Sequence, residues 1–208
     1  MTSNTDTRDS IIAAARSLFD RGLTHGSTGN ISVRSGDTIL VTPTGSSLGT
    51  VEAHDLSVIN ERGQHIDGPK PSKESFLHAA VLRARPAAHA VVHTHSTYSA
   101  AVSCLADLDP SNALPPLTAY FAMRIGKLPL LPYHAPGDDT LEPLAEDVAS
   151  RHLAFLLSNH GPVVAGSTLG AAMDAIEELE ETAKLYLLLQ GHATRPLSEE
   201  QAAALRPR

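Results

Sequence analysis

Two histidines one residue apart follow an apolar stretch of the chain. Residues 90–96 read AVVHTHS, so His93 and His95 come directly after a run of alanine and valine. Alternate side chains of a β-strand point to the same face, so we expect the two imidazoles to project together while Thr94 turns away. Paired imidazoles at the end of a buried strand suit two ligands of one metal ion. The spacing therefore predicts a metal centre that needs further ligands.

A third histidine lies in a tight turn later in the chain. His160 follows the apolar run AFLLSN and precedes Gly161 and Pro162. Zinc held by three imidazoles keeps an open coordination position, which is the pattern of catalytic zinc sites. Any one of these histidines alone could serve only to bond a backbone carbonyl. The prediction of a metal site therefore depends on the three histidines together.

Glu74 is the carboxylate best placed for acid–base chemistry near such a metal. It lies in KPSKESFLH, in the first turn of a helix that we expect Ser72 to cap. A carboxylate there also complements the helix dipole, so its position alone leaves a structural role open. His78, one turn later, is expected to be a packing or surface residue.

Three short loops are rich in hydroxyl groups and backbone donors. They read STGN at 27–30, TPTG at 42–45 and KPSK at 70–73. Together they could surround a phosphate group with N–H and O–H donors, and Lys73 or Lys70 could add positive charge. The sequence contains neither a Walker loop nor the glycine fingerprint of a dinucleotide site.

The elements that must position these residues are a mixture of strands and helices. We expect helices over 8–22, 72–85, 96–106, 138–152 and 168–190, and a short one from Ser198. We expect strands in a hairpin around 36–37, in a short pair around 61–63, over 88–95 and 127–133, and on both sides of a turn at 159–161. Since most strands are hairpin-joined, the sequence predicts an α/β fold, a three-layer α/β/α sandwich with a mixed, mostly antiparallel central sheet.

The composition fits one domain spanning residues 1–208. Apolar residues make up 42% and the formal net charge is −7, so we expect a packed core and no nucleic-acid or membrane partner. Cys104 is the single cysteine, which excludes an internal disulfide. The first ten residues are polar and no apolar run approaches a membrane span, so we expect a soluble cytoplasmic protein.

An ordered set of motifs resembles the class II aldolase and adducin family. The motifs are GNISVR, TPTG, KPSKE, VVHTHS and NHGPVVAG, and the resemblance extends from Arg8 to about Gln190. Four further stretches resemble one branch of it, the 3-oxo-tetronate 4-phosphate decarboxylases: TPTGSSLG, HSTYSAAVSCLADLDPSN, TAYFAMRIGKLPLLPYHAPGD and MDAIEELEETAKL. The resemblance implies decarboxylation to dihydroxyacetone phosphate and carbon dioxide through a metal-stabilised enediolate.

The same resemblance implies roles for individual residues. It implies a divalent metal, usually zinc with manganese or cobalt as alternatives, at His93, His95 and His160. It implies that Glu74 is the catalytic acid and base. Our own hypothesis adds that Glu74 could fill the fourth coordination position while substrate is absent. Phosphate contacts are implied for Gly29, Asn30, Thr44, Gly45 and Ser72. Lys73 is not part of that family pattern, and we expect its positive charge to pair with the phosphate or a carboxylate of the substrate. In a four-fold symmetric homotetramer, Tyr120 would reach the active site of a neighbouring subunit.

Other members of the family provide the alternatives. Lys73 stands where the family's aldolases often have serine, and the tail LSEEQAAALRPR lacks their C-terminal tyrosine. A fuculose-phosphate-type aldolase, which would release an aldehyde where a decarboxylase releases carbon dioxide, is the first alternative. A dehydratase or an epimerase is a weaker alternative. The epimerase usually has aspartate where Glu74 stands, whereas the dehydratase shares the glutamate, so only substrate assays exclude it. Adducin-like modules lack the metal histidines, so the intact set favours catalysis.

Overall fold

Eight strands form one mixed sheet in the computed structural model, which describes residues 4–205. The strands are β1 (Asn30–Ser35), β2 (Thr38–Val41), β3 (Ser57–Ile59), β4 (His65–Asp67), β5 (Ala90–His93), β6 (Leu130–Leu131), β7 (Ala154–Leu157) and β8 (Gly161–Gly166). They lie in the order β4-β3-β2-β1-β5-β8-β7-β6, and each neighbouring pair is antiparallel except β6 with β7. The ends of the predicted domain, 1–3 and 206–208, lie outside the described residues.

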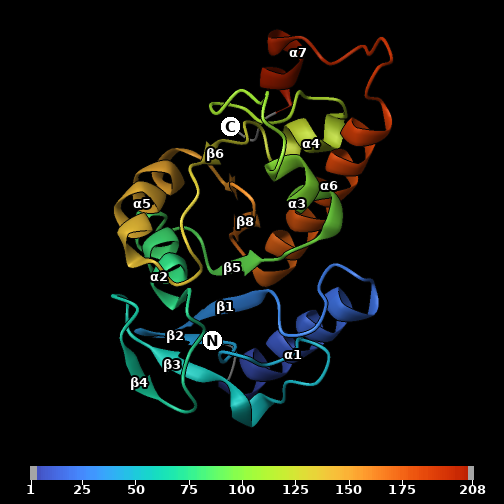
Figure 1. The fold of residues 1–208 in the computed structure, drawn as a ribbon. Helices are drawn as coiled ribbons and strands as arrows, with labels where there is room; N and C mark the ends of the chain where they lie inside the picture. Colours follow the sequence, from blue (N-terminus) through green and yellow to red (C-terminus); the bar gives the residue numbers. More distant parts are fainter. Residues whose placement is uncertain (1–3, 206–208) are drawn as a thin grey trace.

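Helices cover both faces of this sheet (Figure 1). They are α1 (Asn4–Asp20), α2 (Ser75–Ala84), α3 (Thr97–Ser103), α4 (Ala119–Arg124), α5 (Glu142–Arg151), α6 (Leu169–Leu188) and α7 (Glu199–Ala204), with 3-10 turns at Ala53–Asp55 and Asp139–Leu141. Helices α2 and α5 pack on one face, and α1, α3 and α6 on the other. The predicted α/β/α sandwich with a mostly antiparallel sheet is confirmed. No helix within 4–205 has the length and apolar character to span a bilayer.

Alternation along β5 decides which way its last residue points. Val92 joins the apolar cluster under α1 and α6, whereas Val91 joins the cluster under α2 and α5. His93 comes two residues after Val91, so its side chain faces the α2 side of the sheet. Asn30, the first residue of β1, pairs with His93 across the sheet. The end of β5 therefore brings His93 close to both the start of β1 and the start of α2.

Some element boundaries differ from those predicted. Helix α2 begins at Ser75 with Glu74 as its N-cap, so the prediction that Ser72 caps this helix is wrong. The Ser72 hydroxyl instead accepts the N–H of Glu74 at 3.3 Å, in a local turn that serine side chains favour. Strand β5 ends at His93, so His95 lies just beyond it. Helix α4 was not predicted.

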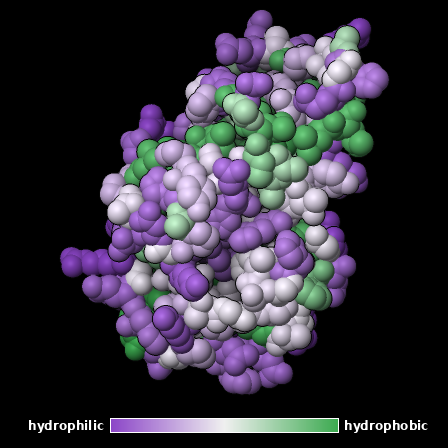
Figure 2. Space-filling model, in the orientation of Figure 1, coloured by the Kyte–Doolittle hydropathy of each residue, from purple (hydrophilic) through white to green (hydrophobic). Residues whose placement is uncertain are grey.

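The surface is polar over most of one face but not all of it. Figure 2 shows apolar surface gathered over the region where α4 and the end of α6 lie in Figure 1. Helix α4 exposes Met123, and the end of α6 exposes Leu185 and Leu188, the last at 65%. Hydration of these apolar side chains is unfavourable. This surface is therefore well suited to contact another apolar surface.

Candidate metal centre

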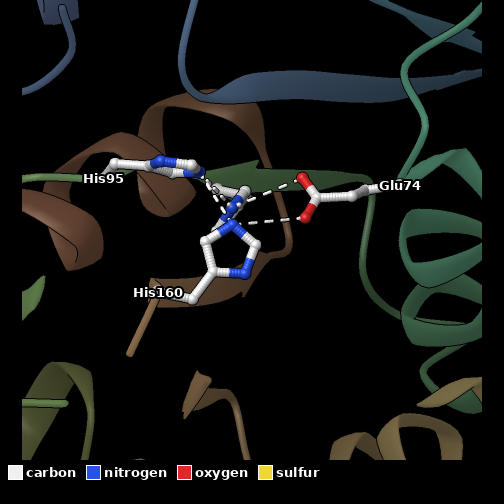
Figure 3. Close-up of side chains that lie close together, drawn as sticks. Glu74, His95 and His160 are labelled. Carbon is white, nitrogen blue, oxygen red and sulfur yellow. Dashed lines mark hydrogen bonds and ion pairs between the residues drawn. The ribbon is translucent and has the colours of Figure 1, made fainter. Parts of the chain in front are cut away.

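Three imidazoles and one carboxylate meet at the end of β5. The Nε2 atom of His95 lies 3.1 Å from Nε2 of His93 and 2.9 Å from Nε2 of His160. The Glu74 carboxylate approaches from the start of α2, with oxygens 3.4 Å from Nε2 of His93 and of His160 (Figure 3). One donor atom from each residue lies within 4.8 Å of the others. The predicted residues are thus brought together in one place.

Helix α3 fixes the turn that carries His160. Asn159 adopts the left-handed backbone conformation with φ of 55°, which asparagine tolerates better than most residues. The carbonyl of Ser103, the last residue of α3, accepts the Asn159 N–H at 3.1 Å. The hydroxyl of Ser103 accepts the His160 N–H at 3.2 Å. Helix α3 also begins two residues after His95. The position of this one helix therefore determines how far apart the imidazoles of His95 and His160 lie.

The hydrogen bond of His93 shows which ring nitrogen faces the cluster. Nδ1 of His93 lies 2.8 Å from the carbonyl oxygen of Pro162. A carbonyl only accepts, so Nδ1 carries the proton and Nε2 presents a lone pair to the other ligands. Metal-binding histidines are commonly oriented by such a bond on the ring nitrogen away from the metal. The chemistry of this donor set therefore fits a divalent metal ion.

The local electrostatics favour the protonation states that metal ligands need. Burial raises the pKa of Glu74, but the charges of His93 and His160 and the amide of Asn30 lower it to about 2 overall. Burial, followed by repulsion from His93, lowers the pKa of His95 to about 3 and that of His160 to about 4. Near neutral pH the carboxylate is therefore ionised and these two rings are neutral.

A pocket of about 220 Å³ opens beside the cluster. All the residues predicted to contact substrate line it: Gly29, Asn30, Thr44, Gly45, Ser72 and Lys73. Glu74, His95 and His160 line it too, as do Ser27, Thr28 and Pro43 of the loops predicted to surround a phosphate, whereas Pro136 lies outside those loops. Larger hollows of about 550 and 570 Å³ lie elsewhere and are lined by none of the four cluster residues. The smaller pocket at the cluster is therefore the candidate substrate site, because it combines the metal ligands with anion donors.

The start of β1 forms one wall of this pocket. Gly29 has φ of 78°, and a Cβ there would lie 3.0 Å from the carbonyl oxygen of His93, so the close approach requires glycine. The side-chain amide of Asn30 donates to Oε2 of Glu74 at 2.9 Å and to the Ser72 hydroxyl at 3.1 Å. Asn30 thus joins the acid–base candidate to the predicted phosphate site.

Tyr120 is placed differently from the other predicted residues. It lies on α4, is 59% exposed and does not line the pocket of its own chain. Its ring centroid lies 5.7 Å from the guanidinium carbon of Arg124. Its predicted role at the site of a neighbouring subunit stays a prediction.

The sequence did not assign a role at the site to two buried polar residues, His78 and Glu180. His78, expected to be a packing or surface residue, is fully buried and contacts Ser32 and Asn30 through its two ring nitrogens. His78 lies one helical turn after Glu74, and this spacing could have indicated that the two side chains share one face of the helix. Glu180 on α6 accepts the backbone N–H and the hydroxyl of Ser99 at 2.8 and 2.6 Å. It stands in an acidic helical stretch that gave no hint of burial.

The fold and the cluster together define a metal-dependent α/β/α enzyme. The chain matches the family described as Class II Aldolase and Adducin N-terminal domain over residues 9–187. The chain therefore belongs to the class II aldolase and adducin family, as its motifs predicted.

Individual relatives fall into two activities. The chain is 47% identical over 205 residues to the 3-oxo-tetronate 4-phosphate decarboxylase of Haemophilus influenzae, covering 97% of this chain and 96% of that protein. It is 37% identical over 178 residues to the L-fuculose phosphate aldolase of Methanocaldococcus jannaschii, covering 85% and 93%. The crystal structure of YgbL from Klebsiella pneumoniae superposes with a TM-score of 0.96 at 44% identity, covering 99% of this chain and 100% of that one.

Proposed function

We propose that this chain is a metal-dependent carboxy-lyase that converts a 3-oxo-tetronate 4-phosphate to dihydroxyacetone phosphate and carbon dioxide. The observation that carries the proposal is the convergence of three imidazoles and Glu74 beside a pocket lined with anion donors. The higher identity to the Haemophilus influenzae decarboxylase than to the aldolase supports a decarboxylase. Lys73, where the family's aldolases often have serine, supports a substrate with an additional carboxylate.

The reaction breaks the bond between the carboxylate carbon C1 and the hydroxyl-bearing C2. The electron pair left on C2 is shared with the ketone oxygen on C3, and C2 must then gain a proton. His93, His95 and His160 would hold a divalent ion, which when bound would supply positive charge to stabilise this electron pair. We propose zinc, because it suits imidazole and carboxylate ligands, with manganese or cobalt as alternatives.

Glu74 holds the proton that C2 receives. Its Oε2 accepts from the Asn30 amide, which leaves Oε1, 3.4 Å from Nε2 of His160, to carry the proton. Because the pKa of Glu74 is about 2, the resting group is ionised. The reaction consumes one proton from the solvent, which passes to C2 by way of Oε1 and leaves the carboxylate ionised again after each turnover. Protonation of C2 then yields the hydroxymethyl group of dihydroxyacetone phosphate.

The pocket orients the substrate through its anionic groups. Backbone N–H groups of the loops at Gly29 and Gly45 and the hydroxyls of Thr44 and Ser72 are the proposed phosphate donors. The exposed ammonium of Lys73 pairs with the phosphate or the carboxylate. This local set of donors offsets the unfavourable net charge of −7 for an anionic substrate.

We also propose that the chain forms a homotetramer in which Tyr120 serves a neighbouring active site. The exposed Tyr120 and Met123 on α4 support this proposal, as does the apolar surface in Figure 2.

A substrate assay tests the proposed reaction. Metal-loaded protein is incubated with 3-oxo-tetronate 4-phosphate, and carbon dioxide and triose phosphate are measured. We expect equal amounts of the two products. Cleavage of fuculose 1-phosphate with no carbon dioxide released from the tetronate would instead assign the chain to the aldolases.

A Glu74→Gln variant tests the role of the carboxylate. We expect it to keep bound metal, because the three imidazoles remain, and to lose turnover, because an amide carries no transferable proton at Oε1. Glu200→Gln, at an exposed position on α7, is the matched control. Undiminished turnover in Glu74→Gln would refute its role as the acid.

A further inference from the structure

A buried line of side chains runs from β1 to Glu74. Nδ1 of His78 lies 2.7 Å from the hydroxyl of Ser32, and Nε2 of His78 contacts Oδ1 of Asn30. Nδ2 of Asn30 lies 2.9 Å from Oε2 of Glu74. His78 and Ser32 are fully buried, and Asn30 is 6% exposed. His78 is thus a buried ionisable residue that the proposed mechanism does not use directly.

The Asn30 amide determines where each proton in this line must lie. Its NH₂ group donates to the Glu74 carboxylate, so its carbonyl oxygen faces His78. An amide oxygen only accepts, so Nε2 of His78 must carry the proton. Nδ1 of His78 then has a lone pair and accepts the hydroxyl proton of Ser32. Every hydrogen bond in the line therefore points from Ser32 toward Glu74.

The reversed amide would be unfavourable at both ends. It would place Oδ1 of Asn30 against the Glu74 carboxylate and an N–H against the N–H of His78. Buried polar groups that lose their partners are costly, so the Nε2–H of His78 and the Glu74 carboxylate together hold the amide in this orientation. Burial, followed by repulsion from His93, lowers the pKa of His78 to about 3, so the ring keeps a single proton near neutral pH.

The direction of these hydrogen bonds also determines which way the hydroxyl of Ser72 donates in the pocket. The Ser72 hydroxyl oxygen accepts one N–H from the Asn30 amide at 3.1 Å and the backbone N–H of Glu74 at 3.3 Å. With both lone pairs engaged, the hydroxyl proton of Ser72 is directed to donate into the pocket. A donor suits an anionic substrate group better than an acceptor would.

We propose that His78 is a positioning residue whose Nε2–H fixes the Asn30 amide, and through it the Glu74 carboxylate and the donor hydroxyl of Ser72. This inference rests on the proposed function, in which Glu74 delivers a proton to the substrate.

The tautomer of His78 can be measured without substrate. Nitrogen-15 NMR of the imidazole side chains in metal-loaded protein distinguishes protonated from unprotonated ring nitrogens. We expect His78 to show a protonated Nε2 and an unprotonated Nδ1 at pH 7. A ring protonated on Nδ1, or on both nitrogens, would overturn the inference.

Two variants of His78 test its effect on turnover. His78→Leu removes both ring nitrogens, whereas His78→Gln retains a side-chain N–H that can donate to Asn30. We expect His78→Leu to lower kcat about 10- to 100-fold, the effect of misplacing one charge-assisted hydrogen bond, with unchanged metal content per chain. His78→Gln should recover much of this loss. Leu77→Ala is the control, a buried change on the same helix that leaves the hydrogen-bonded line intact. The folded fraction of this variant should have the kcat of the wild-type protein.

The outcomes separate positioning from general structural damage. Wild-type kcat in His78→Leu, loss of activity only in proportion to lost metal, or no advantage of His78→Gln would each overturn the inference. If His78→Leu does not fold, the NMR tautomer and the kcat of His78→Gln decide. If the wild-type protein releases no carbon dioxide, the proposed function fails, and the tautomer alone decides the inference about His78.

Discussion

The proton on Nδ1 of His93 determines what the metal centre can bind. It is donated to the Pro162 carbonyl, so the Nε2 lone pair of His93 faces the other ligands. Two more Nε2 atoms, those of His95 and His160, lie within 3.1 Å of a neighbouring ring nitrogen. Lone pairs held so close repel one another unless a cation lies between them. A bound metal ion should therefore stabilise the fold as well as enable the reaction.

Removing one imidazole should weaken both metal binding and this stabilisation. Losing a residue that only orients a metal ligand typically lowers metal affinity about 10- to 100-fold. We expect His160→Ala, which removes a ligand itself, to lower it further. For the wild-type protein, free metal at about 100 times Kd should add about 2.7 kcal/mol to the free energy of unfolding. Chelator competition measures the affinity, and thermal unfolding with and without chelator measures the stabilisation.

The control for this variant is His54→Ala, a histidine whose side chain is 78% exposed. It should bind metal like the wild-type protein. Equal metal affinity in His160→Ala and in the wild-type protein would show that His160 is not a ligand.

Gly161 holds the His160 turn close to the strand beside it. A Cβ at Gly161 would lie 2.3 Å from the carbonyl oxygen of Thr94, so this backbone contact leaves no room for a side chain. We expect Gly161→Ala to lower the free energy of unfolding by about 1–3 kcal/mol and to weaken metal binding, because the turn must move. Denaturant titration and metal analysis give the two values.

A second glycine provides the comparison for Gly161→Ala. Gly170 lies in α6 with open space around it, the nearest atom to an added Cβ being 3.8 Å away. Gly170→Ala should stabilise the helix by about 0.5–1 kcal/mol. A neutral effect of Gly161→Ala would mean that the turn adjusts freely.

At the scale of elements, α3 connects the metal ligands to the rest of the fold. Its first turn is held by Glu180 of α6, whose carboxylate accepts the N–H groups of Tyr98 and Ser99 at 2.8 Å each. Its last residue, Ser103, holds the turn of His160. Because His95 precedes α3 and His160 contacts its end, a shift of this one helix would change the separation of two ligands.

Replacing Glu180 should therefore affect both stability and the metal centre. Glu180→Gln keeps the side-chain shape but leaves one acceptor oxygen where two are used, and it sets an NH₂ group against backbone donors. We expect a loss of about 1.5–3 kcal/mol in the free energy of unfolding, the usual value for a hydrogen bond to a charged group. Metal affinity should fall in parallel, as measured by chelator competition on folded protein.

Glu181→Gln is the matched change, since Glu181 is exposed on the same helix and pairs only weakly with Lys184 at 3.9 Å. It should change stability by less than about 0.5 kcal/mol. Equal effects of the two variants would contradict the anchoring of α3 by Glu180.

Periodic elements were predictable from the sequence, whereas contacts between elements were not. The hairpin of β1 and β2 and the long helix α6 follow from local patterns that the structure reproduces. Helix α4 was missed because its six residues show no clear helical period, whereas the equally short α7 was predicted from Ser198 at its start. The convergence of His93 and His95 was predicted from the two-residue period of a strand, although β5 ends at His93 and His95 lies just beyond it. The contact of Asn30 with Glu74 joins residues 44 positions apart, so no local pattern reveals it.

At the scale of the whole molecule, the net charge and one apolar surface have opposite effects on association. The net charge of −7 opposes non-specific association, so any assembly must come from a specific surface. That surface is available over α4 and the end of α6, where Met123, Leu185 and Leu188 are exposed. Tyr120 lies on the same short helix as Met123, so assembly through this region would also place Tyr120 at a subunit boundary.

The proposed tetramer should therefore depend on this apolar surface. We expect the wild-type protein to sediment with four times the 22.0 kDa mass of the chain. A Leu185→Glu/Leu188→Glu double variant should dissociate at micromolar concentration, because burying two added carboxylates without partners is costly. If Tyr120 completes a neighbouring site, kcat should fall with dissociation while metal content stays constant. Ile66→Glu, on β4 and 54% exposed, introduces one carboxylate elsewhere and should leave the assembly intact. A wild-type protein that sediments as a monomer at full activity would refute the tetramer and the role of Tyr120 together.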